Sequence, residues 1–160
     1  MTTDATTGTT AGAGRAAGTD EEQIRALLED RAAATAARDA RRFLAHCAPE
    51  IVQFDLAPPL QLKGPEALDE KAVEAWYATW DGAIEVSLTQ VEITVGDDVA
   101  FSHSINRMHG TKADGFEVEL WSRATTGLRK TGGTWRIAHT HHSVPFLMDG
   151  SGRAALDLAP

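Results

Sequence analysis

Residues 121–146, WSRATTGLRKTGGTWRIAHTHHSVPF, contain the pattern that decides the fold. Two extended segments flank Gly132-Gly133, and a two-glycine connection between such segments is typical of a β-hairpin. Because side chains alternate between the two faces of a strand, four residues of the second segment are predicted to share one face. These residues are Trp135, Ile137, His139 and His141. An apolar stretch that continues into imidazoles is typical of a pocket wall with a polar end that faces a ligand.

Alternating apolar residues continue upstream of this hairpin and predict a long antiparallel meander. Strands are expected over residues 99–109, 116–130 and 134–144, separated by glycine-containing turns. An earlier strand that starts near Ala83 changes the phase of its alternation near Thr89-Gln90, which predicts a β-bulge there. Its apolar residues are Ile84, Val86 and Leu88 in one phase and Val91, Ile93 and Val95 in the other.

Helices are predicted before these strands. The segment Thr19-Asp20-Glu21-Glu22 has the capping-box pattern, and a helix is expected from there to about Arg38. Helices over residues 40–47 and 65–80 are expected on either side of a short strand, residues 51–55. Helices followed by antiparallel strands predict the α+β class: a cone-shaped fold with N-terminal helices packed on a curved, mostly antiparallel β-sheet.

A single domain is expected over residues 19–147, because 160 residues suffice for one core without metal or disulfide. Residues 1–18, rich in Thr, Ala and Gly, predict a disordered leader, and residues 148–160 predict a flexible tail.

The single cysteine, Cys47, cannot form an internal disulfide and fits a reducing compartment. No apolar run approaches the ~20 residues that cross a bilayer, and no apolar signal core is present, so a cytoplasmic location is expected. A net charge of -8 disfavours nucleic acid and anionic membrane surfaces as partners.

The order of these elements, with several residues in them, resembles the SnoaL-like, ketosteroid-isomerase-like group of the nuclear-transport-factor-two superfamily. The resemblance covers residues 20–146. Its carrying features are Arg38-Asp39 after the first helix, the segment Ile51-Val52-Gln53-Phe54-Asp55, Leu62-Lys63-Gly64 before the next helix, and the closing hairpin. This resemblance implies a cofactor-free isomerase, cyclase or dehydratase that acts on a small apolar or aromatic metabolite. It further implies a role in polyketide-type or antibiotic biosynthesis, and a homodimer formed through the sheet.

Catalytic positions of the steroid isomerases carry over to this chain only in part. Asp55 takes the place of the general-base aspartate, and Arg31 takes the place of the oxyanion-hole tyrosine on the first helix. The second oxyanion donor of those enzymes is an aspartic acid, and residues 124–126 offer no acid. Proton abstraction by Asp55 therefore stays possible, with the oxyanion role passed to an arginine or a histidine.

Residues of the predicted site come from the first helix, the strand end at residue 55 and the three C-terminal strands. The expected catalytic residues are Asp55, His103, His139 and His141, and the expected substrate-binding residues are Arg31, Trp76, Ile105, Arg107 and Arg123. Apolar neighbours are expected to desolvate Asp55, which suits a general acid or base. The face to which Arg123 points depends on the strand register, since a slip of one residue turns Arg123 outward and Ser122 inward. The residues expected to point outward are Met108, Trp121 and His142.

Each of these residues also has a purely structural interpretation. Asp55 can cap a turn, His103 can be a satisfied core histidine, and Arg123 can form a surface ion pair. His139 and His141 could bind a metal with a third ligand, but no set of spaced ligands accompanies them, so no metal is predicted. No phosphate-binding glycine loop is present, and no cofactor is predicted.

Two other functions fit the same pattern. The first is a non-catalytic protein that binds a small molecule in the cone, which the missing oxyanion acid favours. The second is an epoxide hydrolase, which needs a second buried carboxylate that the inward candidates over residues 99–141 do not supply.

Overall fold

A computed structural model describes residues 18–160 of the chain. The predicted disordered leader, residues 1–18, therefore lies outside the described residues except for Gly18. The helices are α1 (Asp20–Ala36), α2 (Ala40–Ala45), the short 3-10 helix η1 (Gly64–Glu66) and α3 (Glu70–Tyr77). The strands are β1 (Cys47–Phe54), β2 (Leu62–Lys63), β3 (Trp80–Val95), β4 (Val99–Lys112), β5 (Glu117–Thr131) and β6 (Thr134–Ser143).

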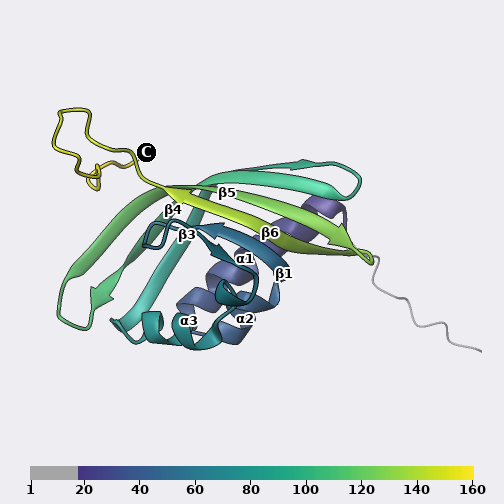
Figure 1. The fold of residues 1–160 in the computed structure, drawn as a ribbon, viewed down its shortest axis with the longest axis horizontal. Helices are drawn as coiled ribbons and strands as arrows, with labels where there is room; N and C mark the ends of the chain where they lie inside the picture. Colours follow the sequence, from purple (N-terminus) through teal and green to yellow (C-terminus); the bar gives the residue numbers. More distant parts are fainter. Residues whose placement is uncertain (1–17) are drawn as a thin grey trace, which may run out of the picture.

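Six strands form one curved sheet in the order β2-β1-β6-β5-β4-β3. The pair β1–β6 is parallel and every other neighbouring pair is antiparallel. Helices α1, α2 and α3 gather on one side of this sheet, which we call its inner face (Figure 1). The predicted α+β class is confirmed. None of the described helices is both long and apolar enough to span a membrane.

Local signals place the start of α1 and its attachment to the sheet. Thr19 and Glu22 form the predicted capping box, in which each side chain bonds the backbone N–H of the other. Asp20 then accepts hydrogen bonds from Lys130 Nζ at 2.7 Å and Trp135 Nε1 at 3.0 Å. These bonds fix the first turn of α1 against the β5–β6 hairpin, so the rest of the helix runs across the inner face.

The chain between α1 and α2 is held to the start of β3. Arg38 ends α1 with a left-handed backbone (φ 55°), and its guanidinium donates to the carbonyl oxygens of Trp80, at 3.0 Å, and Gly82. Asp39 caps the next helix by accepting from Arg42 N. The Arg38-Asp39 pair noted in the sequence is therefore the joint that turns the helical layer back onto the sheet.

Two β-bulges change which residues face the helices. The predicted bulge in β3 is confirmed, because the pairing shifts between Thr89 and Glu92 and Gln90 has a positive φ of 50°. A bulge in β6 was not predicted. There Leu128 pairs with Ile137 while Gly127 pairs with His139, which leaves Ala138 as the extra residue.

The bulge in β6 corrects the predicted faces of its histidines. Before it, Trp135 and Ile137 are buried under the helices; after it, Thr140 is buried instead. His139 and His141 therefore lie on the outer face of the sheet, and the expectation that they point inward is wrong. His142 shares the inner phase with Thr140, although it was expected to point outward.

The same correction applies to β4 and β5. Ala100 pairs with Leu128, and both pack in the core with Ile24 and Leu27 of α1, which fixes the inward phase of the two strands. The predicted site residues of the opposite phase lie on the outer face: His103, Ile105, Arg107 and Arg123. In their place the buried inner positions are Ala100, Ser102, Ser122, Ala124, Thr126 and Leu128. Met108 also points inward, against the prediction, and packs on the core cluster of Tyr77, Trp80 and Ile84.

After β6 the chain leaves the sheet and folds back on itself (Figure 1). Leu147 N donates to Arg153 O and Ala155 N donates to Pro145 O, both at 2.8 Å. Ala155 is buried by this loop, whereas Met148 is almost fully exposed.

Candidate active site

Three elements bring polar side chains together at the inner face. Phe54, the last residue of β1, pairs with His141 of the parallel strand β6. The next residue on each strand, Asp55 and His142, therefore sits at the same end of the sheet. Arg31 approaches both from α1, and its charge and that of Asp55 both act on the pKa of His142. We call Arg31, Asp55 and His142 the inner polar cluster.

Arg31 lies deepest in the inner polar cluster. Its Nε is fully buried and has no hydrogen-bond partner, and its Cζ lies 4.1 Å from the centroid of the Phe43 ring. Burial lowers the pKa of Arg31, and the nearby Cys47, Asp55 and Tyr77 act in the opposite direction. A guanidinium nevertheless stays charged at neutral pH. The predicted inward position of Arg31 on the first helix is therefore the one that the structure has.

His142 provides a neutral imidazole beside this charge. Burial lowers its pKa below the ordinary value of 6.5; Asp55 raises it, while Arg31 and His141 lower it further. A neutral imidazole at pH 7 can accept a proton. The sequence analysis had predicted that His142 points to the outer face of the sheet.

Asp55 is the exposed member of the inner polar cluster. It follows the last residue of β1, and its neighbours Phe54 and Leu56 are 37% and 40% exposed. One carboxylate oxygen accepts from Leu56 N at 2.7 Å. The expected desolvation of Asp55 is wrong, because its apolar neighbours project away from the core instead of covering it.

Two further buried donors, Tyr77 and Trp80, were not predicted to be part of the site, and Tyr77 lies near Arg31. The Trp80 Nε1 is buried without a hydrogen-bond partner among the described residues, whereas the buried Tyr77 hydroxyl has the Thr35 side chain as a partner. Burial raises the pKa of Tyr77, which Thr35 and Arg31 oppose. The sequence analysis selected Trp76 instead, because it predicted one continuous helix over residues 65–80. The helix ends at Tyr77, so Tyr77 faces inward and Trp76 is 37% exposed.

On the outer face, three of the predicted residues do lie together. His103, Ile105 and Arg123 line a shallow hollow of about 260 Å³. His103 Nε2 lies 3.7 Å from Glu92 Oε2, and Arg123 Nε donates to Ser143 Oγ at 3.2 Å. This hollow is open to solvent and separated from the inner polar cluster by the sheet.

The other predicted outer-face residues have structural partners. Arg107 donates from Nε and from an Nη to the two carboxylate oxygens of Glu119, each at 2.6 Å. The rings of His139 and His141 lie edge-on to Phe54, with centroids 4.9 and 5.6 Å away. Within residues 18–160 no group of three or more His, Cys, Asp or Glu side chains could hold a metal ion.

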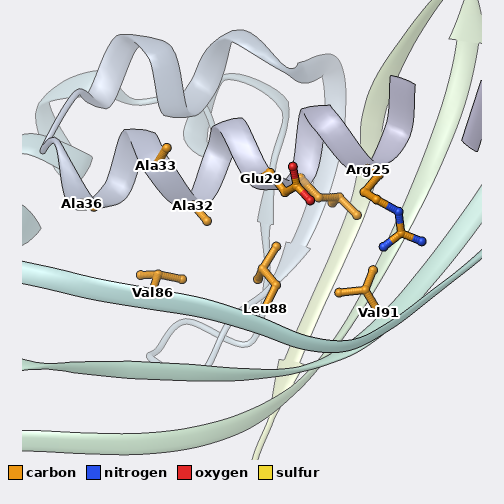
Figure 2. A pocket seen from close by; sticks show the side chains of 9 residues that line it. Arg25, Glu29, Ala32, Ala33, Ala36, Val86, Leu88 and Val91 are labelled. Atoms are coloured by element: carbon orange, nitrogen blue, oxygen red, sulfur yellow. The ribbon is translucent and has the colours of Figure 1, made fainter. Parts of the chain in front are cut away.

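A second hollow runs between α1 and the inner face of β3 (Figure 2). It encloses about 360 Å³ and is lined by Arg25, Leu28, Glu29, Ala32, Ala33 and Ala36 of α1 and by Val86, Leu88 and Val91 of β3. Figure 2 shows the small alanines opposite Val86 and Leu88, with the guanidinium of Arg25 at one end beside Val91. None of its lining residues belongs to the inner polar cluster.

Comparison with known proteins identifies the fold family. The family model of the SnoaL-like domain matches residues 24–147 of the chain. An NTF2-like protein of unknown function from Pseudomonas putida KT2440 is 33% identical, with a TM-score of 0.77 over 88% of this chain and 96% of that one.

Two structures with lower identity share the fold alone. A proposed dehydratase of the NTF2-like family from Streptomyces avermitilis is 20% identical, with a TM-score of 0.68 over 78% of this chain and 95% of that one. A proposed scytalone dehydratase from Novosphingobium aromaticivorans DSM 12444 is 14% identical, with a TM-score of 0.70 over 86% and 91%. No curated protein matches the chain significantly. The chain belongs to the SnoaL-like family within the NTF2-like proteins.

Proposed function

We propose that this protein is a small-molecule enzyme of the isomerase, cyclase or dehydratase type that works by cofactor-free acid–base catalysis. The observation that carries the proposal is the inner polar cluster, in which a neutral imidazole, a carboxylate and a buried guanidinium meet from three elements. Proton transfer next to a carbonyl needs these three functions: a base, a group that stabilises the protonated base, and a cation at the developing oxyanion.

In the proposed reaction His142 removes a proton from the carbon next to a substrate carbonyl. The Asp55 carboxylate favours the imidazolium that forms, since its charge raises the pKa of His142. Arg31 stabilises the enolate oxygen. In a dehydration, the imidazolium returns its proton to a β-hydroxyl, the C–O bond breaks, a C=C bond forms and water leaves.

The substrate class rests on the family. The resemblance to the SnoaL-like family implies an aromatic or apolar metabolite, and two of the similar structures are described as proposed dehydratases. We therefore propose a polyketide-type aromatic or apolar metabolite as substrate, with dehydration as the first reaction to assay.

Deuterium exchange tests this proposal with model ketones in place of the natural substrate. The protein is incubated in D₂O with a panel of β-hydroxy ketones and aromatic ketones, and mass spectrometry records deuterium uptake and water loss. We expect His142→Gln to reduce the exchange rate at least ~100-fold, the range for loss of a general base. Asp55→Asn should reduce it less, because Asp55 is exposed and acts through His142.

His103→Gln is the matched control for these variants. His103 lies on the outer face with a half-exposed side chain, so the variant should exchange at the wild-type rate. Wild-type exchange in His142→Gln would remove His142 from the mechanism.

A non-catalytic binding protein is the second candidate, and the exposure of Asp55 favours it. In that case the inner polar cluster would only orient a ligand. Native mass spectrometry of the protein after incubation with the same panel decides between the two: a bound species of unchanged mass, with no deuterium uptake, supports binding alone.

A further inference from the structure

Arg31 carries a buried positive charge that no carboxylate neutralises by direct contact. Within residues 18–160 its guanidinium forms no ion pair, and its Nε has no hydrogen-bond partner. The closest favourable contact is the face of the Phe43 ring, 4.1 Å from Cζ. A buried charge without a bonded partner costs several kcal/mol, so buried charges in proteins are usually paired.

The groups around Arg31 do not supply the missing negative charge. Burial raises the pKa of Cys47 and of Tyr77, so both side chains are neutral at pH 7. His142 is neutral there as well, since burial lowers its pKa. Asp55 is exposed, so water screens the attraction between its carboxylate and Arg31. The interior near Arg31 is therefore net positive.

The same region also contains unused hydrogen-bond donors. Arg31 Nε and Trp80 Nε1 are each buried without an acceptor in the described part of the chain, whereas the Tyr77 hydroxyl has the Thr35 side chain as a hydrogen-bond partner. Tyr77 and Trp80 are only 3% and 4% exposed, whereas Arg31 as a whole keeps part of its surface accessible. The accessible part of Arg31 is where a ligand can approach, and acceptor oxygens are what this region lacks.

We infer that the site takes a substrate with a carboxylate group, which binds two N–H groups of the Arg31 guanidinium and leaves the others for the enolate oxygen. This inference rests on the proposed function, because it assigns the substrate class of the same site. A carboxylate matches the planar donor pattern of a guanidinium in a two-point contact. It also neutralises the charge that the fold leaves unpaired.

Matched ligand pairs test this inference by binding instead of turnover. Benzoate and 2-naphthoate are compared with benzamide and 2-naphthamide, which have the same shape without the charge. We expect the two carboxylates to raise the melting temperature in a concentration-dependent way and to shift the Arg31 Nε–Hε resonance in NMR spectra. The two amides should do neither.

Variants locate the binding. Arg31→Met should weaken carboxylate binding about 10-fold or more, the loss expected for one charged hydrogen bond. Arg31→Lys serves if the methionine variant does not fold, since lysine keeps the charge but loses the planar donor pair. Arg25→Met is the control, because Arg25 lies on the same helix and faces the second hollow.

The outcomes separate the inference from the proposed function. Equal binding of carboxylates and amides, or carboxylate binding that survives in both Arg31 variants, would overturn the inference. Absence of carboxylate binding together with His142-dependent exchange of a neutral ketone would overturn it as well, while the proposed function stands. Arg31-dependent carboxylate binding without any deuterium exchange supports the inference and counts against the proposed reaction.

Discussion

The His142 imidazole links the protonation of the inner polar cluster to the stability of the fold. Burial lowers its pKa in the folded protein, while in the unfolded chain the value is about 6.5. The unfolded chain therefore binds the proton more tightly, and the free energy of unfolding rises with pH in this range. The stabilisation is complete above pH ~6.5 and is lost as the pH falls from there through the folded-state pKa.

We expect His142→Gln to flatten this dependence, because glutamine does not titrate. Urea denaturation of the two proteins between about pH 5 and pH 8 measures it. The wild-type midpoint should fall at the acidic end, and the variant midpoint should fall less. His103→Gln, on the outer face with a half-exposed ring, should keep the wild-type slope. A His142→Gln slope identical to wild type would mean that His142 is as solvated in the folded protein as in the unfolded chain.

At the level of elements, Asp30 joins α1, α2 and the start of β1. Its Oδ1 accepts from Arg42 of α2, with Nε at 3.0 Å, and its Oδ2 lies 2.6 Å from His46 Nε2, directly before β1. The hydrogen bond from Arg42, helped by that from His46, lowers the pKa of Asp30 to about 2. This cluster fixes the angle between α1, which carries Arg31, and the strand that leads to Asp55.

Asp30→Asn should lower the free energy of unfolding at neutral pH by only about 0.5–1 kcal/mol, because the side chain is 34% exposed and water screens the pairs. The contribution is present above pH 3.8, the ordinary value for Asp, and is lost as the pH falls through about 2. Chemical denaturation at pH ~7 measures the difference. Glu29→Gln removes the same charge from the neighbouring position, which has no hydrogen bond among those described, and should be neutral. A loss in Glu29→Gln as large as that in Asp30→Asn would indicate a general charge effect instead.

Local signals explain which elements could be predicted from the sequence. The capping box at Thr19, the bulge near Gln90 and the Gly132-Gly133 turn each depend on a few adjacent residues, and all three are present. Gly132 and Gly133 both have positive φ, 57° and 80°, as a two-residue hairpin turn requires.

The inward face of the last three strands could not be predicted in this way. In β4 the phase with Phe101 and Ile105 is the more apolar one, yet it lies outside, because Ala100 of the opposite phase belongs to the core cluster with Ile24 and Leu27 of α1. In β6 imidazoles occur in both phases, so nothing in the sequence marks Ala138 as the extra residue. Long-range packing decides both cases. Arg31 and Asp55 therefore lie at the inner face, as the sequence predicted, whereas the histidine beside them is His142 instead of His139 or His141.

For the whole molecule, the outer face of the sheet carries apolar side chains that a monomer leaves in water. Phe54 is 37% exposed and Phe101 is 48% exposed, and both lie on this face, as do the half-buried Ile105 and Trp121. The polar side chains between them, such as Arg107 and Glu119, already pair with each other. A surface of this composition suits contact with a second copy of itself.

We propose a homodimer formed through this outer face. Light scattering coupled to size exclusion should give twice the chain mass of 17.1 kDa for the wild type. Phe101→Asp should give the single-chain mass, because a carboxylate placed at a well-packed interface would be desolvated without a partner. Folding of the variant should be unaffected, since Phe101 is half-exposed in the single chain.

Phe116→Asp is the control for this prediction. Phe116 is 66% exposed but lies in the turn before β5, so this variant should stay dimeric. If the wild type has the single-chain mass, or if Phe101→Asp stays dimeric, the outer face is not the dimer interface. The imidazoles of His103 on β4 and of His139 and His141 on β6 would then face solvent.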